Sequence, residues 1–165
     1  MPQEPDFRPE EILRILNDHE VLYVVIGGMA AVIHGSDIPT TDIDVTPDQS
    51  LSNLQRLSAA LREMNAKIWT QPEAEGLSFD HDGASLADVQ ILNLMTDYGR
   101  LDVTRTPAGT QGYDDLKRDA MTVDVFGLAV SVASLADVVR SKQAAGRPKD
   151  LQFLPTLRRL LDEAQ

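Results

Sequence analysis

The sequence predicts one domain of the α+β class, in which a mixed β-sheet is flanked by helices. Two observations predict this class. Apolar runs of strand length alternate along the 165 residues with segments of helical periodicity, and a strand–turn–strand pattern lies near the middle of the chain. A chain of this length corresponds to about one domain, and it buries an ordinary core without disulfides. We expect that core over residues 10–161.

The first third of the chain is predicted to alternate between helices and strands. Pro9 suits the first position of a helix, and an apolar stripe follows it at residues 12, 13, 15 and 16. After a turn at 47–50, apolar residues three or four positions apart predict a core-facing helix of about four turns. These residues are Leu51, Leu54, Leu57, Leu61 and Met64. The expected order is helix 9–20, strand 21–26, helix 29–34, loop 36–41, strand 42–45 and helix 51–64.

The rest of the chain is predicted to add a hairpin, further strands and three helices. Asp97-Tyr98-Gly99 is the turn between two alternating apolar runs. Residues 71–88 are acidic and without periodicity, so they are expected to form a loop, either a lid over a site or a disordered segment. The expected order is strand 67–70, loop 71–88, hairpin 89–103, loop 106–111, helix 113–120, strands 121–126 and 128–132, helix 134–146 and a last helix from 148.

The last helix carries both a supporting pattern and a departure from it. Pro148 suits its first position, and five leucines are expected to face inward. These are Leu151, Leu154, Leu157, Leu160 and Leu161. Pro155 removes a backbone donor within the same segment, so it is expected to kink the helix or to shift its start.

Composition limits the functions that the chain can have. The formal net charge is −11 and there are no cysteines, which argues against a protein that coats DNA or RNA and excludes thiolate metal sites. No apolar run approaches the roughly 20 residues of a membrane-spanning helix, so we expect a soluble, cytoplasmic protein without a membrane partner. Residues 1–99 contain 5 Lys/Arg and 17 Asp/Glu, whereas residues 100–165 contain 10 and 9. Any binding of polyphosphate would therefore depend on the C-terminal third.

A glycine pair follows the first predicted strand. Val24-Val25-Ile26 runs into Gly27-Gly28 and then into Met29-Ala30-Ala31, an order typical of strand, tight turn and helix. Because glycine has no Cβ, its backbone N–H group can approach an anion such as phosphate, and the start of the following helix favours negative charge. A simple turn is the alternative interpretation of such a pair.

Asp42 and Asp44 flank Ile43 in the second predicted strand. Side chains alternate along a strand, so both carboxylates face one side while Ile43 and Val45 face the core. Two carboxylates at this spacing repel each other, and a divalent cation that prefers oxygen ligands removes the repulsion. A solvated edge strand with two surface acids is the alternative.

Asp102 is a third acid in a strand environment. It lies between Leu101 and Val103 in the return strand of the predicted hairpin. Burying an unpaired carboxylate there would cost several kcal/mol or force it into the neutral form, so Asp102 needs a partner. A hairpin acid that faces solvent is the alternative.

Taken together, these motifs resemble the signature of the DNA polymerase β-like nucleotidyltransferase superfamily. A strand, the pair Gly27-Gly28, a short helix, a connection of thirteen residues and the Asp42-Ile43-Asp44 motif follow one another in that order. His34-Gly35 and Thr40 extend the likeness to the small bacterial and archaeal nucleotidyltransferases, including those of toxin–antitoxin and abortive-infection systems. The resemblance implies a nucleotidyltransferase fold, with a sheet like the palm of polymerase β.

The resemblance also implies roles for particular residues. Gly27 and Gly28 would hold a nucleoside triphosphate, and Asp42 and Asp44 would ligate magnesium. Asp102 falls at the position of a third carboxylate, which would ligate the second metal and act as the general base for an attacking hydroxyl. Two Mg²⁺ ions are implied, for which Mn²⁺ can substitute. The implied reaction transfers a nucleoside monophosphate to a hydroxyl acceptor and releases pyrophosphate.

The C-terminal cations extend this resemblance but carry an alternative. The run from Ser134 to Asp150 is similar to the C-terminal part of the small nucleotidyltransferases. Within it, Lys142 is the best candidate for a triphosphate contact, with Arg147 and Lys149 behind it. The alternative is that these charges complement helix ends and pair with Asp150.

One position departs from the family pattern, and two histidines are ambiguous. Ile38 stands where many relatives have an arginine two residues before the threonine of the Thr-x-Asp-x-Asp segment, so nucleotide affinity is expected to be lower or to come from another cation. His34 is expected to contact either a nucleotide or nearby backbone. His81, between Asp80 and Asp82, is either a metal ligand or simply exposed.

The acceptor is left open by the sequence. An RNA 3′ end such as that of tRNA, a protein hydroxyl or a small molecule such as an aminoglycoside would each present the same nucleophile. A toxin role with an antitoxin partner is implied by the resemblance alone. The alternative function is a non-catalytic nucleotide-binding or interaction protein that keeps the fold.

Overall fold

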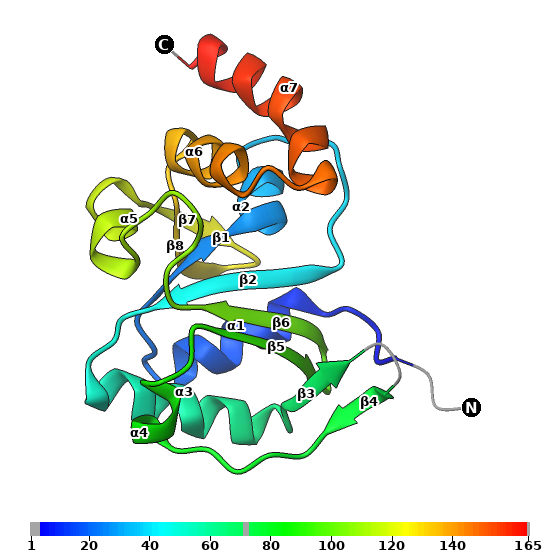
Figure 1. Ribbon diagram of the computed structural model, residues 1–165, viewed down its shortest axis with the longest axis vertical. Helices are drawn as coiled ribbons and strands as arrows, with labels where there is room; N and C mark the ends of the chain where they lie inside the picture. The colour runs from blue at the N-terminus through cyan, green and yellow to red at the C-terminus, as the bar shows by residue number, and fades with distance from the viewer. Residues whose placement is uncertain (1–3, 71–72, 165) are drawn as a thin grey trace.

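An eight-stranded mixed sheet is the centre of the fold. The computed structural model describes residues 4–70 and 73–164, and the strands within this part follow the order β4-β3-β5-β6-β2-β1-β8-β7 (Figure 1). The central strand β2 (Asp42–Pro47) is antiparallel to β1 (Tyr23–Ile26) and parallel to β6 (Gly99–Thr104). The predicted α+β class, with a mixed sheet flanked by helices, is confirmed.

The remaining strands extend the sheet on both sides of this centre. On one side lie β5 (Ile91–Thr96), β3 (Lys67–Thr70) and β4 (Glu73–Leu77), and on the other lie β8 (Leu128–Val132) and β7 (Met121–Val125). β5 and β6 form the predicted hairpin, and β7 and β8 form a second antiparallel pair. The helices of the described residues are α1 (Pro9–Asp18), α2 (Gly27–Ile33), α3 (Leu51–Glu63), α4 (Gly83–Leu86), α5 (Tyr113–Asp119), α6 (Leu135–Ala145) and α7 (Pro148–Glu163).

The helices form two groups around the sheet. One group consists of α1, α3 and α4, in which α3 contacts both of the others, and the second consists of α2, α6 and α7, which gather toward the C-terminal end of the chain (Figure 1). The apolar stripe of α1 is fully buried. Leu57 and Leu61 of α3, and Met64 directly after α3, are buried as well, each at most 1% exposed. No helix within residues 4–70 and 73–164 has both the length and the apolar character required to cross a bilayer.

The segment 71–88 differs from the predicted loop. β4 (Glu73–Leu77) pairs antiparallel with β3, and α4 (Gly83–Leu86) begins with a capping box between Asp82 and Ser85. Residues 71 and 72 lie outside the described residues. β4 is an edge strand with a glycine in it, and α4 is a single turn, so neither is long enough to produce a readable periodicity.

Two further expectations are corrected by the structure, and for Pro155 one of the two expected effects is excluded. The helix after β1 begins at Gly27 instead of Met29, so the glycine pair forms its first turn. Leu51 and Leu151 are 54% and 50% exposed, because each lies in the first turn of a helix and beyond the packed part of its stripe. Helix α7 runs from Pro148 through Pro155 to Glu163, so the second proline does not shift its start.

Candidate active site

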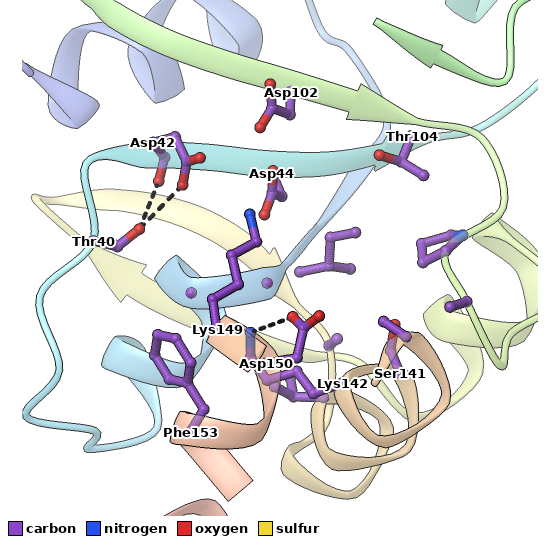
Figure 2. Close-up of a pocket in the computed structure, with 18 of the residues that line it drawn as sticks. Thr40, Asp42, Asp44, Asp102, Thr104, Ser141, Lys142, Lys149, Asp150 and Phe153 are labelled. Carbon is purple, nitrogen blue, oxygen red and sulfur yellow. Dashed lines mark hydrogen bonds and ion pairs between the residues drawn. The ribbon is translucent and has the colours of Figure 1, made fainter. Parts of the chain in front are cut away.

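Asp42, Asp44 and Asp102 come together on one face of the sheet. The parallel register of β2 and β6 sets Asp44 opposite Asp102 and Asp42 opposite Arg100. One carboxylate oxygen from each of the three acids lies within 4.8 Å of the other two, and Figure 2 shows the three side chains around a common space. Ile43 and Val45 are fully buried on the opposite face, as the strand alternation predicted. We refer to the three acids as the carboxylate cluster.

The carboxylate cluster is electrostatically costly without a counter-charge. Burial raises the pKa of Asp44 well above the ordinary range of an aspartate, and the neighbouring charges of Asp42 and Asp102 raise it further. Burial likewise raises the pKa of Asp102. Asp102 Oδ1 is buried and accepts no hydrogen bond from the described residues. Three oxygen donors, one of them unsatisfied, suit a hard divalent cation such as Mg²⁺ or Mn²⁺.

The glycine pair lies directly against this cluster. Gly27 has a φ of +67°, and a Cβ built on it would lie 2.1 Å from Asp44 Oδ2. A Cβ on Gly28 would lie 2.9 Å from Thr40 Oγ1, and that hydroxyl donates to Asp42 Oδ1 at 3.1 Å. Gly27 therefore lets the backbone of α2 approach Asp44, and Gly28 lets it approach the Thr40 hydroxyl, more closely than any side chain would allow.

Two of the predicted phosphate-binding cations are held by one buried acid. Lys142 Nζ lies 3.7 Å from Asp150 Oδ1 and 4.1 Å from the centre of the Phe153 ring. Arg147 Nε donates to Asp150 Oδ2 at 2.6 Å. Burial lowers the pKa of Lys142, while Asp150 and Asp44 oppose that effect. We call these four residues the α6–α7 corner, and its ion pairs match the alternative in which the charges pair with Asp150.

Lys149 is directed at the carboxylate cluster. Figure 2 shows its side chain extending from the start of α7 toward Asp44, whereas Lys142 turns to Asp150. Within the described part of the chain Lys149 forms no ion pair. The sequence placed Lys149 behind Lys142 because spacing along a helix does not show which side chain enters a cavity.

A cavity of about 500 Å³ surrounds the carboxylate cluster. On the side of β1 and the α6–α7 corner its lining includes Gly27, Gly28 and Lys149. On the side of β5 and β6 its lining includes Asn93 and Arg100. The cluster thus lies between two parts of one cavity, which is the arrangement that a transfer between two bound substrates requires.

Arg100 and Trp69 are site residues that the sequence reasoning missed. Arg100 Nη1 lies 3.9 Å from Asp42 Oδ2, and its Nη2 lies 3.6 Å from Asp102 Oδ1. The guanidinium carbon lies 4.0 Å from the centre of the Trp69 indole. The alternation of β6 contained the signal, because Arg100 precedes Asp102 by two residues and so shares its face.

Both ambiguous histidines make structural hydrogen bonds. His34 Nε2 donates to the carbonyl oxygen of Ala133 at 2.7 Å, in agreement with the backbone alternative. His81 Nδ1 forms a hydrogen bond of 2.7 Å with Ser58 Oγ. In residues 4–70 and 73–164 the only group of acids and histidines close enough to share a metal is the carboxylate cluster, so His81 is not part of such a group.

Comparison with solved structures finds the same architecture in nucleotidyltransferases. The lincosamide antibiotic adenylyltransferase LnuA, solved with lincomycin bound, has a TM-score of 0.63 at 16% identity, with 94% of this chain and 99% of LnuA covered. The antibiotic-resistance factor ANT(2'')-Ia has a TM-score of 0.60 at 13% identity, over 95% of this chain and 82% of that protein.

A third neighbour comes from Thermotoga maritima and is provisionally described as a nucleotidyltransferase. Its TM-score is 0.52 at 19% identity, with 96% of this chain and 97% of that chain covered. Neither the protein-family models nor the curated proteins match the sequence. The likeness of fold that the sequence motifs implied is confirmed, and the chain has the fold of the nucleotidyltransferases.

Proposed function

We propose that the protein is a metal-dependent nucleotidyltransferase that transfers a nucleoside monophosphate from a nucleoside triphosphate to a hydroxyl group. One observation carries this proposal. Three carboxylates meet with oxygens within 4.8 Å of one another, directly beside the glycine pair at the start of α2 and the side chain of Lys149. A protein that kept the fold for interaction alone would gain nothing from the repulsion among these acids.

The residues of this chain divide the chemistry between them. Asp42, Asp44 and Asp102 would hold the two divalent ions, which would supply positive charge to stabilise an in-line displacement at phosphorus. The backbone of Gly27 and Gly28 and the ammonium of Lys149 bind the triphosphate and offset the charge on the departing pyrophosphate. Asp102 accepts the proton of the acceptor hydroxyl. The bond from the acceptor oxygen to the α-phosphorus forms while the bond to the β-phosphate breaks.

Support for a small-molecule acceptor comes from the structural neighbours. LnuA was solved with lincomycin, and ANT(2'')-Ia was also solved with adenylyl-2''-tobramycin, over 93% of this chain at 14% identity. An RNA 3′ end or a protein hydroxyl is open as an acceptor for the same chemistry. A toxin role with an antitoxin partner stays a prediction from the resemblance of the sequence motifs.

The test is transfer of label from each of the four α-labelled nucleoside triphosphates, with Mg²⁺ or Mn²⁺, into RNA, protein, lincomycin and tobramycin. Asp42→Asn and Asp44→Asn should abolish transfer because each removes a metal ligand, while the fold is retained. Asp162→Asn serves as the matched control, since Asp162 is exposed near the end of α7. Turnover by either site variant within a few-fold of the wild-type rate would exclude these roles.

A further inference from the structure

Arg100 lies on the side of the carboxylate cluster away from the glycine pair. In the sheet β2 lies between β6 and β1. β1 leads into α2, which carries Gly27 and Gly28, whereas β6 carries Arg100 and Asp102. A triphosphate bound at the glycine pair and Lys149 would therefore meet the carboxylates from one side. Arg100 marks the other side, from which an acceptor hydroxyl would reach Asp102.

The guanidinium of Arg100 has unused hydrogen-bonding capacity. Its ion pairs with Asp42 and Asp102 measure 3.9 and 3.6 Å between the charged atoms, which is longer than a hydrogen bond. Within the described residues its Nε is buried and has no hydrogen-bond partner. An arginine side chain presents five N–H donors in a planar fork that fits phosphate oxygens. A half-buried guanidinium with donors to spare is therefore suited to a ligand oxyanion.

Trp69 holds the guanidinium in place for such a ligand. The Arg100 Cζ lies 4.0 Å from the centre of the indole ring, and the arginine side chain is only 23% exposed. Stacking on an aromatic face restricts the rotation of the guanidinium while leaving the N–H groups at its edge available. The arginine side chain has thus lost most of its conformational entropy before a ligand binds, which lowers the entropic cost of binding.

The neighbouring lining completes an acceptor site. Asn93 pairs with Asp102 in the β5–β6 register and is exposed, so its amide lies beside the proposed base. Ile91, on the same face of β5, is 53% exposed. Both residues line the cavity together with Arg100. An amide, an apolar side chain and a guanidinium thus lie beside Asp42 and Asp102, and the guanidinium is the group of this lining that suits an anionic ligand.

We propose that Arg100 binds a phosphate of the acceptor, and that the acceptor therefore carries a phosphate close to its nucleophilic hydroxyl. A mononucleotide and the 3′-terminal nucleotide of an RNA strand share this chemistry. The inference rests on the proposed nucleotidyl transfer and narrows its acceptor class. Arg100 stays protonated throughout and takes no part in making or breaking bonds.

The test measures acceptor binding at equilibrium, with the donor site filled. Wild-type protein is saturated with Mg²⁺ and the α,β-methylene analogue of its preferred nucleotide, and calorimetry then gives the Kd of adenosine, 5′-AMP and a 5′-phosphorylated RNA dinucleotide. Arg100→Gln should raise the Kd of the two phosphate-bearing probes by about 10- to 100-fold, the range expected for charge-assisted hydrogen bonds. The Kd of adenosine should change less than about twofold, because adenosine lacks the phosphate. Tighter binding of 5′-AMP would identify a mononucleotide as the acceptor, and tighter binding of the RNA dinucleotide would identify an RNA strand.

Two further variants separate anion binding from a general effect on the site. Trp69→Ala should weaken the phosphate probes less than Arg100→Gln does, since it frees the guanidinium without removing it. Arg158→Gln, an equal change of charge at an exposed position of α7, should have no effect on any probe.

Several outcomes would overturn the inference. These are equal weakening of adenosine and 5′-AMP in Arg100→Gln, no weakening of either, or failure of the wild-type protein to bind either phosphate probe. Tighter binding of tobramycin than of both phosphate probes would also reject it. If the wild-type protein does not bind the methylene analogue with Mg²⁺, the proposed nucleotidyl transfer itself fails, and this inference falls with it.

Discussion

The two sides of the carboxylate cluster hold their cations in different ways. At the α6–α7 corner, Lys142 and Arg147 are paired with Asp150, whose side chain is only 4% exposed. At β6, the guanidinium of Arg100 stacks on Trp69 and forms no hydrogen bond with the described residues. A cation near an active site is therefore not evidence of a ligand contact by itself. What distinguishes the two sides is whether the hydrogen-bonding capacity of the cation is already used.

The largest expected effect tests whether Asp150 and its paired cations stabilise the fold more than Arg100 does. Asp150→Ala leaves the Lys142 ammonium buried without its carboxylate, so we expect the free energy of unfolding to fall by about 3 kcal/mol. Arg100→Gln should change it by less than about 1 kcal/mol, because its ion pairs are long. Urea denaturation of both variants gives the two values. Adding Lys142→Met to Asp150→Ala should restore part of the loss, and equal losses in Asp150→Ala and Arg100→Gln would remove the distinction between the two sides.

The next effect concerns the backbone that faces the cluster. Gly27→Ala would push a methyl group into Asp44 and displace a metal ligand, so kcat should fall by about 100-fold. Gly127→Ala is the matched control. Gly127 also has a positive φ, of +80°, but a Cβ built on it would meet nothing within 4 Å. Equal rates for the two variants would show that the collision with Asp44 is without consequence.

A smaller effect separates the two lysines near the glycine pair. Lys149→Met should raise the KM for the nucleotide by about tenfold, the value of one charge-assisted hydrogen bond, with no change in thermal stability. Lys142→Met should lower the melting temperature, because Asp150 loses one of its two cations. Steady-state kinetics and thermal denaturation measure both. The opposite pattern would make Lys142 the phosphate ligand that the sequence first suggested.

The smallest effect is a pH dependence of stability in the absence of metal. Because the pKa of Asp44 is raised in the folded state, the folded protein binds this proton more tightly than the unfolded chain does. The free energy of unfolding should therefore fall as the pH rises from the ordinary aspartate pKa through the raised one. Asp44→Asn lacks this loss and should be about 1 kcal/mol more stable than wild type at neutral pH in EDTA.

Mg²⁺ should reverse that order, because only the wild-type protein gains stability from binding the ion at a complete site. Melting temperatures at several pH values, with EDTA and with excess Mg²⁺, test both statements. A wild-type stability that does not respond to Mg²⁺ would contradict the metal site itself.

Much of the carboxylate cluster could be predicted because strand alternation fixes which side chains share a face. Asp42 and Asp44 were placed on one face of β2, and the hairpin placed Asp102 in a strand. The register that sets Asp44 opposite Asp102 is a parallel pairing between distant strands, and local pattern does not determine such a pairing. Only the resemblance to a known family suggested that these residues meet.

The parts that were missed depend on contacts between segments far apart in the sequence. Trp69 meets Arg100 because β3 pairs with β5, which in turn pairs with β6. The difference between Lys142 and Lys149 depends on how α7 packs against α6. The strand β4 does not show in the sequence pattern, because a short edge strand with a glycine gives no clear alternation. Periodicity indicates that a segment is a helix or a strand, but it does not show in which direction a side chain at the α6–α7 corner points.

Trp69 is the only tryptophan in the chain, and it lies against Arg100 beside the carboxylate cluster. Its intrinsic fluorescence therefore originates at the site itself, without interference from another indole. Quenching by the stacked guanidinium should change whenever Arg100 moves toward a ligand, so the unlabelled protein can report acceptor binding in a stopped-flow instrument. The same residue that holds the arginine thus makes the kinetics of its engagement measurable.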